Sequence, residues 1–158
     1  MCIRILVAFF LSFTLASAAK IKADKILVSK RNNIMFLLKD GKVLKRYRVM
    51  LGRNRIGHKQ REGDHRTPEG IYHISQKNNQ SKFYKALRIS YPNAQDAKRA
   101  AKKGVRPGGD IMVHGVQECL AHLEKPYRYS RGCIIINNTE MDEVWSLVDQ
   151  GTTIEIRP

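Results

Sequence analysis

The chain of 158 residues carries 29 Lys and Arg against 14 Asp and Glu, which gives a formal net charge of +15. With 42% hydrophobic residues and three cysteines, the composition is typical of one globular domain and excludes a disordered chain or a disulfide scaffold. The positive charge predicts anionic surroundings, which leaves nucleic acid, an anionic membrane or wall polymer, and an acidic substrate as alternatives.

Residues 1–19 have the pattern of a secretory signal peptide. Arg4 supplies the positive start, residues 5–16 are almost entirely apolar, and Ala16-Ser17-Ala18 provides a cleavage site of small residues. The apolar stretch is shorter than the roughly 20 residues that span a bilayer, and an uncleaved anchor is the alternative. We therefore expect export to the periplasm or cell wall, with residues 20–158 as the mature domain.

The pattern after residue 25 predicts a mainly β domain with a few short helices. Asp40-Gly41, between two apolar runs, predicts a tight hairpin. The strands are expected, in chain order, at 26–28, 34–38, 43–51, 70–74, 87–91, 110–114, 133–136 and 152–156.

Two segments predict helices. The first covers 94–103, has Ala97, Ala100 and Ala101 on one face, and ends at Gly104. The second begins at a cap, Asn138 or Thr139, and runs to Asp149 before Gly151. Its apolar stripe consists of Met141, Val144, Trp145 and Val148.

Two further segments carry residues suited to nucleophilic catalysis, and each adjoins an apolar run. One contains His114 and Gly115, and the other is Ser130-Arg131-Gly132-Cys133. A cysteine attacks a carbonyl as its thiolate, and a neighbouring imidazole can take the thiol proton. The N–H groups of Gly132 and Cys133 are candidates for an oxyanion hole. From residue types alone, the alternative is a buried structural cysteine and an unrelated histidine.

Cys119 and His122 lie between these segments and allow other interpretations. With His114 and Cys133 they could form a zinc set, but the spacing fits no compact metal motif, so no metal is expected. A disulfide between Cys119 and Cys133 is another alternative in an oxidising compartment. We expect instead that Cys119 is a packed free thiol.

These motifs, taken in order, resemble the L,D-transpeptidase catalytic domain (YkuD-type) family. The family carries a His-Gly segment followed later by Ser/Thr-x-Gly-Cys, which correspond here to His114-Gly115 and to the segment ending at Cys133. Further similarity covers 25–52, 63–70, 90–93, 107–110 and 138–158. The resemblance implies a β-sandwich-like fold with a substrate cleft, no cofactor, and activity on the stem peptides of peptidoglycan.

The resemblance also implies roles for individual residues. Cys133 would attack the bond before D-alanine and form a thioester, with His114 as base and later acid. Gly132 and Cys133 would supply the oxyanion N–H groups, and a backbone carbonyl in the turn 130–132 would orient the imidazole. Ser130 and Gly115 complete the predicted substrate-binding set with Arg131. An amine would then resolve the thioester, giving a cross-link or an attached lipoprotein.

The sequence departs from the family pattern at two positions. Arg131 stands where His is commonest, and Ile135 stands where many members have Arg or Asn. Arg131 could contact a substrate carboxylate through its planar guanidinium, favour the Cys133 thiolate, or point into solvent.

Basic clusters at 45–48, 53–61 and 98–103 are interpreted as surface that attracts an anionic wall polymer. Export argues against nucleic acid as the partner. Two other functions stay open: an L,D-carboxypeptidase or wall peptidase that uses the same cysteine and histidine, and a non-catalytic wall-binding domain.

Overall fold

A computed structural model describes residues 21–123 and 128–158, and these form eight strands and two α-helices. The predicted signal peptide therefore lies outside the described residues. The helices are α1 (Ala94–Lys102) and α2 (Asn138–Leu147), and a 3₁₀ turn, η1, covers Glu118–Leu120. The strands are β1 (Lys25–Ser29), β2 (Ile34–Lys39), β3 (Lys42–Arg48), β4 (Gly70–Ser81), β5 (Tyr84–Ile89), β6 (Met112–His114), β7 (Ile134–Ile135) and β8 (Thr153–Arg157).

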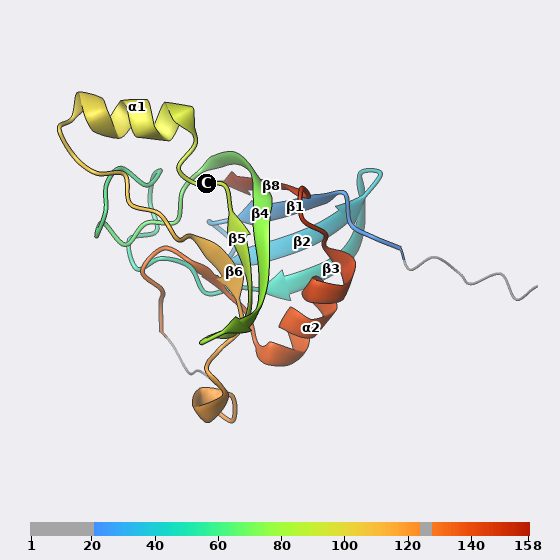
Figure 1. Ribbon diagram of the computed structural model, residues 1–158. Coiled ribbons are helices and arrows are strands. Elements are labelled where there is room, and N and C mark those ends of the chain that lie inside the picture. The colour runs from blue at the N-terminus through green and yellow to red at the C-terminus, as the bar shows by residue number, and fades with distance from the viewer. Residues whose placement is uncertain (1–20, 124–127) are drawn as a thin grey trace, which may run out of the picture.

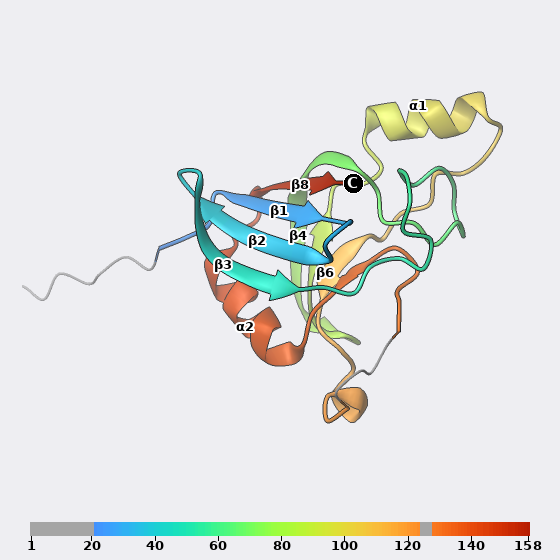
Figure 2. The ribbon, with the colours of Figure 1, turned by 180° about the vertical axis from the view of Figure 1, so that it is seen from behind.

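The strands are hydrogen-bonded in the order β3-β2-β1-β8-β4-β5-β6-β7. Strand β4 belongs to both halves of this order, because Gly70 to His73 pair with β8 and the residues from Ile74 onward pair with β5. The two halves therefore run in different directions: β1 to β3 cross the view while β4 and β5 run down it (Figures 1 and 2). This arrangement confirms the predicted mainly β, sandwich-like fold.

The core lies between the two halves of the sheet and is built by alternation along the strands. Ile26 and Val28 of β1 and Met35 and Leu37 of β2 are fully buried, while their neighbours are partly exposed. The predicted hairpin joins β2 to β3, and both Asp40 and Gly41 have positive φ. Such backbone matches the right-handed twist of the two strands, which explains the Asp-Gly pair.

Several predicted strand limits were wrong. Strand β4 continues to Ser81 and β5 begins at Tyr84, because a polar hairpin extends past the apolar pattern that guided the prediction. Strand β3 ends at Arg48, although Met50 still forms a bridge to Ile135. Strand β6 begins at Met112 and not at Asp110, whose φ of 53° breaks the extended backbone.

Helix α1 projects from the strands, as Figure 1 shows, and its buried face differs from the prediction. Asp96 and Ala100 are buried, whereas Ala97 and Ala101 are exposed. Asp96 lies on the buried face because its carboxylate accepts a hydrogen bond from the hydroxyl of Tyr72 at 3.0 Å. A capping box at Asn93 starts this helix.

Helix α2 packs against the core through Met141 and Val144, which confirms the apolar stripe. Its cap is Asn137, one residue before the predicted candidates, because the Asn137 side chain accepts the N–H of Glu140 in a capping box. The helix ends at Leu147 and not at Asp149. Neither helix of the described segments has the length and apolar character needed to cross a lipid bilayer.

The connection from β3 to β4 is anchored by a buried lysine, Lys30, whose side chain is 2% exposed. Its ammonium donates to the carbonyls of Gly57 (2.7 Å) and Thr67 (3.1 Å) and to the carboxylate of Glu69 (2.7 Å). All three ammonium protons are therefore used, and they hold this loop against the end of β1.

Candidate active site

Two adjacent strands bring together the segments that carry His114 and Cys133. Strands β6 and β7 are parallel, with Val113 opposite Ile134 and His114 opposite Ile135. Partners in a ladder project from the same face, and side chains alternate along a strand. Cys133, two residues before Ile135, therefore projects from the same face as His114, one diagonal step away. Val113 and Ile134 project the opposite way and are fully buried in the core.

The imidazole of His114 is held in one tautomer by its own backbone neighbour. Nδ1 lies 2.6 Å from the carbonyl oxygen of Gly115, which can only accept, so Nδ1 carries the proton and Nε2 is the acceptor. The orienting carbonyl is thus that of Gly115, and the prediction of one in the turn 130–132 was wrong. In that turn, the Ser130 carbonyl accepts the N–H of Arg53 at 3.0 Å.

Burial keeps the His114 imidazole neutral. The side chain is 3% exposed, and desolvation lowers its pKa below the ordinary value of 6.5, against the opposing effect of the hydrogen bond to Gly115. The ring of Phe83, from the turn between β4 and β5, stacks on the imidazole with centroids 4.5 Å apart. A neutral imidazole with a fixed Nδ1–H is the form that can accept a proton at Nε2.

The thiol of Cys133 is partly buried and lies against the beginning of β6. It donates to the carbonyl oxygen of Asp110 at 3.5 Å, and no hydrogen bond joins it to His114 within the part of the chain described. Burial raises the pKa of the thiol, while the Met112 N–H and, less strongly, the Lys59 ammonium lower it. The thiol is therefore protonated at neutral pH and depends on a base to become a nucleophile.

The turn before Cys133 is tied by one hydroxyl. Ser130 Oγ accepts the N–H of Gly132 at 2.9 Å and donates to the carbonyl of Cys133 at 2.6 Å. The predicted use of the Gly132 N–H as an oxyanion donor does not fit this geometry, because that donor is occupied. The Cys133 N–H has no hydrogen-bond partner within 21–123 and 128–158, so it is the available donor.

Glycine is required at position 132 for two reasons. Its φ is +133°, which L side chains rarely adopt, and a Cβ there would lie 2.8 Å from the carbonyl oxygen of Arg66. Gly115 is also closely packed: a Cβ would lie 2.5 Å from Asn138 Oδ1, the atom that accepts the Val116 N–H. The predicted roles of Ser130 and Gly115 are therefore structural in this geometry, because both hold backbone near the thiol and the imidazole.

Arg131 is exposed and lines a pocket of about 340 Å³ beside the thiol. Lys59, Asp110 and Ile111 line the same pocket. Lys59 was missed as a site residue because it belongs to a basic cluster interpreted as surface, yet its side chain is 4% exposed. Phe83 was also missed, since a single aromatic in a polar turn carries no signal in the sequence.

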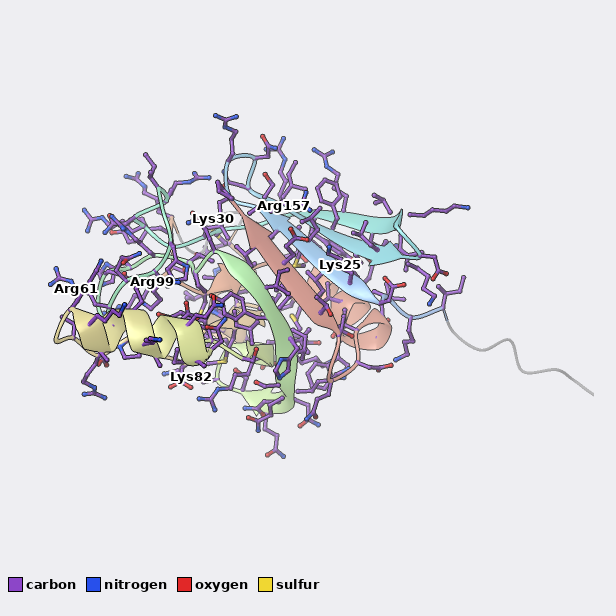
Figure 3. The ribbon with its side chains drawn as sticks, turned by 90° about the horizontal axis from the view of Figure 1, so that it is seen from above. Lys25, Lys30, Arg61, Lys82, Arg99 and Arg157 are labelled. Atoms are coloured by element: carbon purple, nitrogen blue, oxygen red, sulfur yellow. The ribbon has the colours of Figure 1, made fainter. Side chains whose placement is uncertain are left out.

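The remaining candidates lie away from this arrangement. Cys119 is free and exposed, so the expectation that it is packed was wrong, and neither described cysteine forms a disulfide. His122 is exposed too. Among the described residues, no three His, Cys, Asp or Glu side chains are grouped to hold a metal ion. Basic side chains occur on several sides of the molecule, with Arg99 on α1, Arg61 near that helix, and Lys25 and Arg157 over the strands (Figure 3).

Comparisons with known proteins identify the family and the fold of this chain. The "Putative L,D-transpeptidase YafK" of Escherichia coli K12 is 32% identical over 108 residues, which are 67% of this chain and 37% of the relative. The solved structure of the helical cell shape determining protein Pgp2 from Campylobacter jejuni matches with a TM-score of 0.64 at 25% identity, over 85% of this chain and 47% of that one. The structure of Bdellovibrio bacteriovorus Bd1075 matches with a TM-score of 0.60 at 24% identity, over 87% of this chain and 48% of that one.

The chain thus spans little more than a third of the curated relative and about half of these solved structures. The model of the L,D-transpeptidase catalytic domain, YkuD, matches residues 23–156, which include both strand ends that carry His114 and Cys133. This chain belongs to the L,D-transpeptidase catalytic domain family.

Proposed function

We propose that the protein is an exported peptidoglycan L,D-transpeptidase with Cys133 as nucleophile and His114 as general base. The observation that carries the proposal is the neutral His114 imidazole, which projects from the same face as Cys133 and keeps Nε2 as an acceptor. Family membership supports peptidoglycan stem peptides as the substrate class. The pattern of residues 1–19 supports export.

Acylation begins with the transfer of the thiol proton from Cys133 to Nε2 of His114. The sulfur attacks the carbonyl carbon of the bond before D-alanine, and the carbonyl oxygen becomes an oxyanion that faces the Cys133 N–H. The tetrahedral intermediate collapses as the bond to the D-alanine nitrogen breaks. His114 returns its proton to that nitrogen, so that D-alanine leaves as the neutral amine and a thioester remains on Cys133.

Deacylation uses the same groups in reverse. His114 takes a proton from an acceptor amine, whose nitrogen attacks the thioester carbon and forms an amide. The Cys133 thiolate leaves and recovers its proton from His114. An amine of a second stem peptide gives a cross-link, an amine of a lipoprotein gives protein attachment, and water gives hydrolysis.

The test is incubation of the protein with disaccharide tetrapeptides, followed by mass spectrometry of products and protein. We expect released D-alanine, cross-linked dimers and a thioester adduct on Cys133. Cys133→Ala should abolish all three, whereas Cys119→Ala should leave them unchanged, because Cys119 lies outside the site. The absence of D-alanine release and of any Cys133 adduct would overturn the proposal.

Product masses also decide between the remaining alternatives. Tripeptide without dimer, even when an acceptor amine is supplied, identifies an L,D-carboxypeptidase or wall peptidase. Wall pull-down that survives Cys133→Ala, together with no turnover by the natural chain, identifies a non-catalytic wall-binding domain.

A further inference from the structure

The pocket beside Cys133 has a wall with little side-chain bulk. It encloses about 340 Å³, and Gly63, Gly108 and Gly109 form part of its lining. A Cβ at Gly108 would lie 3.5 Å from Cε of Lys59, so the bare backbone leaves the lysine stem room to pack there. This volume is near the lower end of the range for small-ligand sites, so the pocket suits a single small residue.

Lys59 brings a buried positive charge to this pocket. Its ammonium donates to Asp64 Oδ1 at 2.8 Å and to the Arg61 carbonyl at 3.1 Å. An ammonium has three protons, and these two bonds leave one for a ligand. Asp64 itself also accepts backbone N–H groups of Gln60, Arg61 and Arg66, so the loop holds both members of the pair in place.

The carboxylates that line the pocket already have cationic partners. Asp110 pairs with Arg88 at 2.6 Å, and Glu62 pairs with Arg106 at 3.4 Å. Arg131, another lining residue, pairs with no carboxylate of the described segments. Its two parallel N–H groups match the geometry of a carboxylate.

The pocket and the thiol share a wall. The Asp110 carbonyl accepts the Cys133 thiol, and Ile111, which also lines the pocket, approaches position 132 within 3.1 Å of where a Cβ would stand. We propose that this pocket binds the carboxylate of the D-amino acid released by the reaction, with Arg131 as a bidentate donor and Lys59 as a buried second donor. The assignment rests on the proposed function for the identity of the ligand.

The chemistry of the substrate fits this placement. In a stem tetrapeptide the attacked carbonyl carbon is followed by the nitrogen, Cα and carboxylate of a single residue, so the negative charge lies within about 4 Å of the reacting carbon. A peptide that continues past this residue, or one with an amidated end, has no charge there. The pocket therefore selects substrates in which the leaving residue is terminal and carries a free carboxylate.

The first test uses the alkylation rate of the Cys133 thiol to detect binding of an anion in the pocket, and it requires no turnover. The full chain is alkylated with iodoacetate or with uncharged iodoacetamide; in both reactions the sulfur forms an S–C bond and iodide leaves. Mass spectrometry follows the Cys133 and Cys119 peptides in the same sample. We expect the ratio of the iodoacetate rate to the iodoacetamide rate to be higher at Cys133, and Arg131→Gln to lower it there about fivefold, as loss of a charge-assisted pair implies.

The exposed Cys119 is the internal control, and Lys98→Gln, an exposed lysine on α1, is the matched control variant. In Lys98→Gln, the ratio of the iodoacetate rate to the iodoacetamide rate should change at neither Cys133 nor Cys119. Lys59→Gln combined with Asp64→Asn removes the buried pair together, and its folding is checked by thermal melting. If that variant unfolds, Arg131→Gln alone decides the outcome, because its side chain is exposed.

The second test uses D-alanine as the probe. We expect D-alanine to slow alkylation of Cys133 by iodoacetamide, and D-alaninamide, which lacks the carboxylate, to have no effect. Equal ratios at the two cysteines, or a Cys133 ratio unchanged in Arg131→Gln, would overturn the subsite. If the alkylation result holds but tetrapeptides are not turned over, the subsite stands and the proposed function fails.

Discussion

His58 and His114 both contact backbone through Nδ1, but they occupy regions with opposite uses. Nδ1 of His58 accepts the Glu69 N–H at 3.0 Å, and its Nε2 lies 3.0 Å from the Asp96 carboxylate. Both ring nitrogens are engaged, and the ring joins the loop before β4 to α1. Nδ1 of His114 donates to Gly115, and its Nε2 is left as an acceptor.

The difference shows how partners, and not residue type, decide what a histidine does. A carboxylate on Nε2 makes His58 a cross-link, whereas an orienting carbonyl on Nδ1 leaves His114 Nε2 as a free acceptor nitrogen among the described residues. Lys30 and Lys59, the two lysines buried among the described residues, differ in the same way. Lys30 uses all three protons on the loop between β3 and β4, while Lys59 uses two within its own loop and borders the pocket beside Cys133.

The largest expected effect is that of His114→Gln on acylation. Removal of the base should slow formation of the Cys133 thioester by about 10²–10⁴-fold, the usual contribution of general-base catalysis. Single-turnover mass spectrometry with a tetrapeptide measures this rate. His58→Gln is the matched control and should acylate at nearly the natural rate once folded. Equal losses in both variants would contradict the division of roles.

The next effect is on stability at the His58 region. Asp96 is 3% exposed and binds His58, Tyr72 and Arg99, so Asp96→Ala leaves buried partners unsatisfied. We expect a loss of about 3–5 kcal/mol in the free energy of unfolding. Urea denaturation measures it. A loss below about 1 kcal/mol would show that the network is not structural.

Phe83→Leu should have a smaller effect on acylation, through the environment of the His114 imidazole. Leucine keeps apolar bulk but loses the planar stack, so water reaches the imidazole and its depressed pKa rises toward the ordinary value. Acylation should slow about threefold to tenfold, with most of the change in kcat, as expected for a misplaced base. The Lys82 ammonium lies 5.1 Å from the centroid of the Phe83 ring, so Lys82→Met serves as the charge control. An unchanged pH profile in Phe83→Leu would remove its positioning role.

The smallest effect is expected in the natural chain, in the pH dependence of acylation and of Cys133 alkylation. His114 must be neutral to act as base, and its pKa lies below 6.5, so acylation should fall only when the pH drops below that value. The pKa of the Cys133 thiol is raised, so direct alkylation should still increase above pH 9. Measuring the pH profiles of acylation and of alkylation on one preparation gives the pKa of His114 and the pKa of Cys133. Half-maximal acylation above pH 7 would contradict the buried, neutral imidazole.

Much of the fold could be predicted because it depends on local patterns. The Asp40-Gly41 hairpin, the apolar stripe of α2, and the strands before Gly115 and after Cys133 follow from turn chemistry and periodicity. The predicted limits failed where polar residues continue a strand, as in β4 up to Ser81, and where Asp96 is buried by hydrogen bonds and not by hydrophobicity. A hydrophobic pattern indicates neither the polar end of β4 nor the burial of Asp96.

Within the candidate site, the sequence by itself determined the chemical groups: a cysteine after Ser-x-Gly, a histidine before Gly, and an arginine between Ser130 and Gly132. Only the tertiary structure decided which protons are free. Ser130 occupies the Gly132 N–H, Gly115 fixes the His114 tautomer, and Asp64 leaves Lys59 one donor. These three contacts are local, but they form only in the backbone conformation that the folded chain imposes on each turn. Burial depends in addition on contacts between distant segments, such as Lys30 with Glu69 and His58 with Asp96, which spacing along the chain does not encode.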